Sequence, residues 1–386
     1  MHKITFFPLG NADCCRIDTT NGKKLLFDYA NRHDPKDKQD KRIDLFAELK
    51  KDLRESKRDG YDVVAFTHLD DDHVCGAPDF FFLEHAEKYQ SKDRAKIGQM
   101  WVPAAVIVES EPDGDAGIVQ AEARYRLKNK RGIRVFSRPD TLREWMTEQG
   151  LNMADYSDFI IDAGRVVPEF KLDIDGIEFF VHSPFAEHCD DDTYIDRNNA
   201  SLVFQVRLAE GETRTNLILG ADTTHEIWAD IVNVTRYHKR EDRLRWNIFK
   251  LPHHCSYLSL GSEKGKDKTV PDDEVKWLYE EQGQDGSYII STSDPIPSKD
   301  TDQPPHRQAA NYLKGVAAGH DGDFMVTMEH NPDAPKPIVF EVGPKGLEYQ
   351  PSSSSKAGDS KLGAAITAAR GTPAPPAQRV GFGRHD

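Results

Sequence analysis

The stretch VVAFTHLDDDH, residues 63–73, joins an apolar run to a loop of alternating histidine and carboxylate side chains. Its first four residues form a short apolar run that begins with two β-branched valines, which is typical of a buried strand. The loop that follows is poor material for a core, but imidazole and carboxylate are ligands for Zn²⁺, Mn²⁺ or Fe²⁺. The stretch therefore indicates a metal site at a strand end. The alternative is a solvated acidic loop with incidental histidines.

Two further apolar runs end in possible ligands. Residues 217–219 lead into Gly220-Ala221-Asp222, and a carboxylate at a strand end is well placed to bridge two metal ions. Residues 248–251 lead into Pro252-His253-His254. Each pattern is weak by itself, because Gly-x-Asp is a common turn and paired histidines also occur by chance on surfaces.

The order of strand and helix patterns favours an α/β layered domain. Strands are predicted at residues 3–8, 14–18, 24–28, 63–66, 177–182, 201–207, 215–219, 247–251, 287–291, 323–328 and 336–341. Helices are predicted at about 41–57, 224–235 and 306–317. Residues 105–165 carry helical patterns at 116–130 and 140–149 with few strand signals, so we expect a helical insertion or a pair of covering helices there.

The composition changes near residue 350. From there the chain is rich in Ala, Gly, Pro and Ser, and such a segment cannot bury enough apolar surface to order itself. We therefore predict one globular domain over residues 1–348 and a flexible low-complexity tail over residues 349–386.

Composition and charge limit the possible settings. The net charge of −14 argues against a basic protein that coats nucleic acid, but not against a nuclease, because a metal pair is itself a concentrated positive charge. Five cysteines, an odd number, fit a reducing compartment. No apolar run approaches the roughly 18 residues of a transmembrane helix. We expect a soluble, cytoplasmic protein that does not contact a membrane.

Taken together, the three strand-plus-ligand elements resemble the metallo-β-lactamase-fold hydrolases. The nearest resemblance is to the soluble hydrolase domain of ComEC-type DNA-uptake proteins and their stand-alone relatives, which also carry Asp where Asp70 stands here. Residues 6–13, 26–28 and 197–203 are similar to other motifs of that group, so the likeness spans about residues 3–320. The chain departs from the family at Asn11 and Cys255, where Gly is usual, and at Gly220-Ala221-Asp222, which replaces a Gly-Asp pair.

The resemblance implies an αββα four-layer metallo-β-lactamase sandwich and two divalent metal ions, Zn²⁺ or Mn²⁺. His68 and Asp70 would hold the first ion, Asp72 and His73 the second, Asp222 would bridge them, and His254 would complete the second site. His182 is the candidate for the remaining ligand, with His188 as its competitor. Asp13 and Asp28 would be buried supporting carboxylates.

The resemblance also implies hydrolysis by a metal-bridged hydroxide, most plausibly of a phosphodiester in DNA or RNA. Asp72 would orient or protonate the nucleophile, and His253 would donate to the developing oxyanion or support a ligand. His306 would face the substrate, or else simply begin a helix. Protein partners in a multi-subunit system are a further expectation.

Two other functions remain open at this point. One is hydrolysis of a small ester, lactone or cyclic phosphate, because one fold serves many chemistries. The other is a non-catalytic, metal-bearing interaction subunit.

Overall fold

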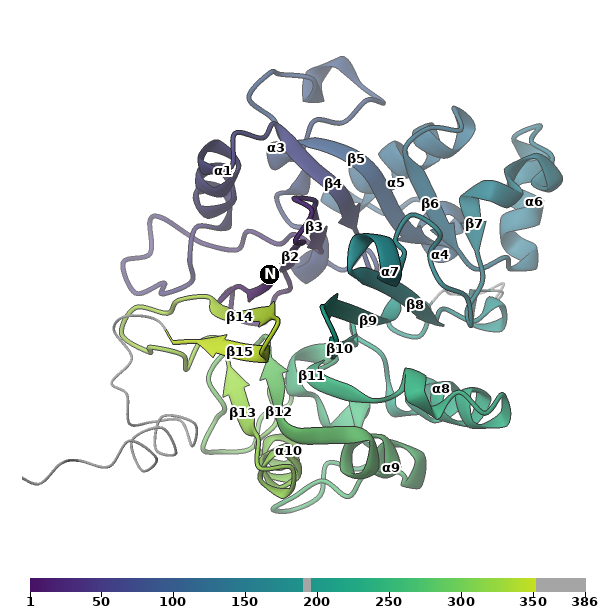
Figure 1. Cartoon of the computed structure of the whole chain (residues 1–386). Helices are drawn as coiled ribbons and strands as arrows, with labels where there is room; N and C mark the ends of the chain where they lie inside the picture. The colour runs from purple at the N-terminus through teal and green to yellow at the C-terminus, as the bar shows by residue number, and fades with distance from the viewer. Residues whose placement is uncertain (190–195, 352–386) are drawn as a thin grey trace, which may run out of the picture. The chain divides into compact units, whose positions relative to one another are not determined.

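Two β-sheets pack face to face on a shared apolar core (Figure 1). The computed structural model describes residues 1–189 and 196–351, with the backbone alone for His188 and Cys189. The prediction of a flexible tail at 349–386 falls almost wholly outside these residues. The last described strand, β15, runs to Gln350, two residues past the predicted domain end.

The first sheet has nine strands within the described residues, in the order β15-β14-β1-β2-β3-β4-β5-β6-β7. They are β1 (His2–Phe6), β2 (Cys15–Asp18), β3 (Lys24–Phe27), β4 (Gly60–Ala65), β5 (Lys96–Pro103), β6 (Ile133–Phe136), β7 (Ile160–Ile161), β14 (Ile338–Gly343) and β15 (Gly346–Gln350). Pairing is antiparallel from β15 to β3 and parallel from β3 to β7.

The second sheet has six strands over the same described residues, in the order β13-β12-β11-β10-β9-β8. They are β8 (Ile177–Ser183), β9 (Val203–Glu210), β10 (Thr213–Leu219), β11 (Trp246–Lys250), β12 (Gly283–Ser291) and β13 (Asp323–Val326). The strands from β10 to β13 are parallel. Parallel neighbours end at the same edge of a sheet, so the loops after β10 and β11 lie side by side.

Helices cover the outer face of each sheet (Figure 1). Those that follow strands of the first sheet are α1 (Leu45–Glu55), α2 (Asp71–Val74), α3 (Ala77–Phe80), α4 (Ala104–Val108), α5 (Gly114–Lys128) and α6 (Asp140–Glu148). Those of the second half are α7 (Leu172–Asp175), α8 (His225–Tyr237), α9 (Asp273–Gln282) and α10 (Arg307–Gly319). Short 3₁₀ turns are η1 (Glu87–Tyr89), η2 (Met153–Phe159), η3 (Ala186–Cys189), η4 (Glu241–Arg243), η5 (His253–Cys255) and η6 (Tyr257–Ser259).

Three large apolar cores lie between these layers in the part of the chain that the structure describes. In β4, Val64 packs in the core under the helices of the first sheet, whereas Val63 and Ala65 pack in the core between the sheets. In β11, Phe249 faces α8 and α9 while Ile248 faces the first sheet. Strands with both faces buried are apolar throughout, which is why residues 63–66 carry no alternation. The predicted α/β class and αββα layering are confirmed.

Residues 105–165 differ from the expected helical insertion. They contain most of α4 together with α5 and α6, but also β6 and β7, which pair in parallel with β5 and extend the first sheet. These strands are only four and two residues long, so their periodicity is too short to be recognised in the sequence. The segment is thus part of the sheet and its covering layer.

Within the described ranges, no helix has the length and apolar character needed to cross a membrane.

Candidate metal centre

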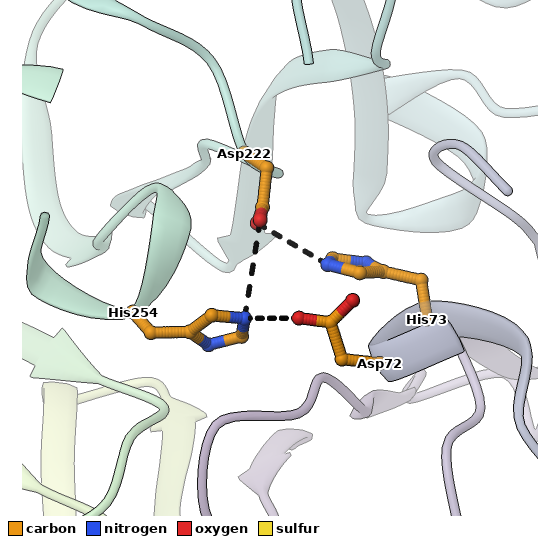
Figure 2. A group of neighbouring side chains, drawn as sticks. All are labelled: Asp72, His73, Asp222 and His254. Atoms are coloured by element: carbon orange, nitrogen blue, oxygen red, sulfur yellow. Dashed lines mark hydrogen bonds and ion pairs between the residues drawn. The ribbon is translucent and has the colours of Figure 1, made fainter. Parts of the chain in front are cut away.

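Four side chains from two sheets converge at their facing edges (Figure 2). Asp72 and His73 lie in α2, directly after the β4 loop, Asp222 follows β10, and His254 lies in the turn after β11. One ligand atom from each lies within 4.8 Å of all the others. The four residues are 182 positions apart at their extremes, so only the packing of one sheet on the other brings them together.

The carboxylate of Asp222 sits between the two imidazoles. Its Oδ1 lies 3.2 Å from His73 Nε2, and its Oδ2 lies 3.9 Å from His254 Nε2. Asp72 Oδ2 lies 2.9 Å from His254 Nε2. Two imidazole nitrogens and two carboxylates at these spacings form a ligand set suited to Zn²⁺ or Mn²⁺.

Hydrogen bonds at Nδ1 set the ring orientation of His73 and His254. His73 Nδ1 donates to Asp28 Oδ2 at 2.9 Å, and His254 Nδ1 donates to the carbonyl of Thr292 at 2.7 Å. Because each acceptor can only accept, Nδ1 carries a proton in both rings, and Nε2 is the nitrogen that faces the centre and can bind a metal ion once its own proton is displaced. Thr67 in turn donates its backbone N–H and its hydroxyl to Asp28.

Three buried candidate ligand atoms at the centre lie close to an oppositely charged group but make no hydrogen bond of good geometry among the described residues. They are His68 Nε2, His73 Nε2 and Asp222 Oδ1. A buried polar atom without a partner costs about 1–3 kcal/mol, and native structures keep few of them. A bound cation would supply the missing partner for all three. The residues present therefore fit a metal ion.

The charges of the cluster are strongly coupled. Burial raises the pKa of Asp72, but its hydrogen bond to His254 and the nearby His73 outweigh this and lower that pKa to about 2. Burial lowers the pKa of His254, but Asp222 and Asp72 outweigh it and raise that pKa to about 9. The carboxylates thus stay anionic at neutral pH and draw positive charge into the centre, as a proton or as a metal ion.

His68 and Asp70 lie beside this group without belonging to it. The rings of His68 and His73 are 3.9 Å apart between centroids, and His68 Nε2 lies 3.5 Å from Asp70 Oδ2. The other oxygen of Asp70 accepts a hydrogen bond from Arg197 at 2.8 Å. The structure therefore places the two residues expected at the first metal next to each other and next to His73.

His182 is not brought to the centre. In β8, Phe179 and Val181 face the core between the sheets, so Phe180 and His182 point to the opposite face. His182 Nε2 is 2.9 Å from the carbonyl of Arg243, and burial lowers the pKa of its ring to about 4. The side chain of His188, its competitor, lies outside the described residues.

The two histidines expected to act on the substrate have different surroundings. His253 Nδ1 is buried without a hydrogen-bond partner in the described chain, and burial lowers the pKa of its ring. His306 receives the backbone N–H of Tyr257 at Nδ1, 3.3 Å away, and stacks edge-on against the Tyr257 ring. Its position directly before α10 matches the simpler reading, in which it begins a helix.

Asp13 and Asp28 are both 3% exposed, so they are buried as expected. Together with His73 they form a second group whose ligand atoms all lie within 4.8 Å of one another, so their role as supports rather than ligands stays a prediction. Asp13 forms an ion pair with Lys250, whose ammonium also donates to the carbonyl of Ala221 at 3.2 Å. A cavity of ≈ 20 Å³, about the size of one water, lies beside this pair. Lys250 and Thr67 carried no predicted role. The sequence signal for Lys250 is a single cation at the end of a mostly apolar strand.

The departures from the family at Asn11 and Cys255 have local explanations. The Asn11 side chain donates to the carbonyl of Pro304 at 2.7 Å and accepts from the Asp294 N–H at 3.0 Å, so it ties the turn in place. Cys255 has a φ of 67°, a left-handed conformation that favours Gly. It is 1% exposed and packs in the core under α8 to α10, as a small apolar side chain does.

Comparisons with known proteins add distant likenesses only. No family model and no curated protein match the chain. Solved structures that resemble it include unliganded yeast PDE1 (12% identity, 84% of this chain and 96% of that one, TM-score 0.39). Another is Tm1679, a metal-dependent hydrolase of the β-lactamase superfamily (10% identity, 88% of this chain and 98% of that one, TM-score 0.39). A third is the metallo-β-lactamase GOB-18 from Elizabethkingia meningoseptica (11% identity, 68% of this chain and 77% of that one, TM-score 0.29). At this level of likeness they assign neither family nor activity to the chain.

Proposed function

We propose that this protein is a binuclear metal-dependent hydrolase that cleaves phosphodiester bonds of DNA or RNA. The observation that carries the proposal is the convergence of Asp72, His73, Asp222 and His254, with both histidines presenting Nε2. Buried imidazole and carboxylate groups gathered at one point are characteristic of metal sites rather than of a core. The resemblance of the sequence motifs supports the same class.

Each residue then has a defined part. His68 and Asp70 would hold the first ion together with Asp222, and Asp72, His73, His254 and Asp222 would hold the second. When bound, such ions supply positive charge for the developing oxyanion and lower the pKa of water towards about 7. Asp72, 24% exposed and therefore reachable by solvent, accepts the proton of the attacking water or orients that water.

The choice of nucleic acid rests on the resemblance and on one basic feature near the centre. Lys264 Nζ lies 5.6 Å from the centre of the Tyr257 ring, and η6, which holds Tyr257, follows the His254 turn directly. An ammonium next to an aromatic ring suits a phosphate and a neighbouring base. The chain as a whole carries a net charge of −14, so we propose that a nucleic acid approaches along this basic side.

The test is hydrolysis of bis-p-nitrophenyl phosphate and of single- and double-stranded DNA with added Mn²⁺ or Zn²⁺. Asp72→Ala is the active-site variant, and Asp71→Ala is its matched control because the Asp71 side chain is 71% exposed. Bound metal is counted by mass spectrometry in each sample. We expect metal-dependent cleavage by the wild type and the control, and at least 100-fold less by Asp72→Ala.

Two results would contradict the proposal. Bound metal without any diester cleavage would point to a small ester or lactone substrate. Failure of the wild type to bind divalent metal would contradict the proposal that the protein is a metal-dependent hydrolase.

A further inference from the structure

Arg197 joins two carboxylates from distant parts of the chain. Its Nη1 donates to Asp70 Oδ1 at 2.8 Å and to the carbonyl of Leu69 at 3.1 Å. Its Nε and Nη2 donate to Glu109 at 2.9 and 2.5 Å. The planar guanidinium thus uses one edge for Glu109 and the opposite end for the Asp70 loop, which a lysine ammonium could not do.

Glu109 is itself held in place. It directly follows α4, and its backbone carbonyl accepts hydrogen bonds from Gln120 at 2.8 Å and Arg124 at 3.0 Å, both in α5. The Glu109 side chain is 17% exposed and that of Arg197 is 26% exposed, so neither is free in solvent. Two packed helices therefore set the position of the guanidinium.

This arrangement determines which way Asp70 points. Asp70 precedes α2 in the capping position, yet its side chain makes no capping hydrogen bond. With Oδ1 held by Arg197, Oδ2 faces His68 Nε2, a buried atom without a hydrogen-bond partner, at 3.5 Å. Two ligand atoms that each lie about 2.0–2.2 Å from one tetrahedral ion are roughly 3.3–3.6 Å apart.

We infer that Arg197 is a positioning residue for the first metal site. Its guanidinium holds Asp70 in the orientation in which Asp70 and His68 can bind the same ion. The inference rests on the proposed metal site and adds a residue that no ligand pattern contains. Arg197 contacts the ligand Asp70 from behind, as the partners of metal ligands commonly do. The second group, Asp72, His73, Asp222 and His254, makes no contact with the guanidinium in the hydrogen bonds and ion pairs of the described chain.

The experiment counts metal ions and measures their affinities, independently of turnover. Metal-free wild type, Arg197→Gln, Arg197→Lys and Glu109→Gln are titrated with Mn²⁺ by calorimetry, and bound metal is measured by mass spectrometry after dialysis. Arg207→Gln is the matched control, because Arg207 also pairs with two carboxylates, Asp242 and Glu178, away from the centre. Circular dichroism checks that each variant folds.

We expect two ions in the wild type and in Arg207→Gln. In Arg197→Gln one ion should bind as before and the other about 10–100-fold more weakly. Arg197→Lys and Glu109→Gln should weaken the same ion by less.

Three results would overturn the inference. Unchanged affinities in Arg197→Gln would show that Asp70 needs no support. Tighter binding of one ion would show that the guanidinium occupies the place of a cation. A wild type that binds no metal would overturn the proposed function and this inference together, whereas the first two outcomes leave that function intact.

Discussion

His73 Nδ1 lies 2.9 Å from Asp28 Oδ2, so the residue after β3 sets which ring nitrogen of His73 faces the metal centre. Asp28 has a φ of 59°, a strained value for a residue other than Gly. Both of its oxygens are used, one by the Thr67 N–H and one by the Thr67 hydroxyl and His73. Asp28 therefore orients the ligand His73, and the effect of replacing Asp28 on metal binding can be measured.

Asp28→Asn should weaken metal binding about 10–100-fold while leaving the ligands in place. The amide can present its NH₂ to His73 Nδ1, which would move the ring proton to Nε2 and block the lone pair. Titration of the metal-free protein with Mn²⁺ measures the effect. Asp52→Asn, which alters a half-buried carboxylate of α1 that is ion-paired with Arg16 and Lys24, is the control. Equal affinity in Asp28→Asn and wild type would refute this role.

Metal binding and metal-free stability should respond to pH in opposite directions. The pKa of His254 is raised from 6.5 to about 9 in the folded chain. A raised folded pKa stabilises the protein below about pH 6.5, and that contribution is lost as pH rises towards 9. The melting temperature of the metal-free protein should therefore fall across this window. Metal must displace the proton, so the apparent affinity should rise by up to about tenfold per pH unit.

Melting curves and metal titrations between pH 6 and 9.5 measure both trends. His254→Ala should flatten them, and His238→Gln, at the exposed end of α8, should not. Parallel rather than opposite trends would contradict the coupling.

Cys255→Gly should be at least as stable as Cys255→Ala, the reverse of the usual order at a buried position. The φ of 67° costs a residue with a Cβ about 1–2 kcal/mol, which Gly avoids. Urea unfolding of the two variants gives the comparison. The thiol should also resist alkylation in the folded protein, because burial raises its pKa to about 12. Rapid alkylation of Cys255 at pH 8 would argue against this burial.

Lys250→Met should destabilise the fold by about 3–5 kcal/mol, because it leaves Asp13 buried without its cation. Burial lowers the pKa of Lys250, but Asp13 and Asp222 outweigh it and raise that pKa, so the amine is charged. The double variant Asp13→Asn/Lys250→Met should recover most of the loss, since no charge remains unpaired. Unfolding by denaturant measures both. A double variant less stable than Lys250→Met would show that Asp13 matters for another reason.

Many of the individual elements could be predicted from local patterns. The run at 63–66 corresponds to β4, the pattern at 41–57 to α1, and 306–317 to α10, because apolar periodicity reflects which faces are buried. The segment 105–165 was harder, since β6 and β7 are too short to show a period and pair only through their neighbours. The sequence pattern does not predict the helix α9 either, because acidic residues interrupt its apolar face.

The candidate site divides in the same way. The residues at 68–73, 222 and 254 are recognisable in the sequence, because each follows an apolar strand and has ligand chemistry of its own. Packing decides whether such a residue reaches the metal centre. His182 lies on the face of β8 that points away from the centre, and its ring contacts the carbonyl of Arg243. The contact of Arg197 with Glu109 spans 88 positions and that of Asp13 with Lys250 spans 237. The residue types that can bind a metal are a local property of the chain and can be recognised in the sequence. The residues that hold these ligands in position come from both sheets and their covering helices, so a local sequence pattern cannot predict them.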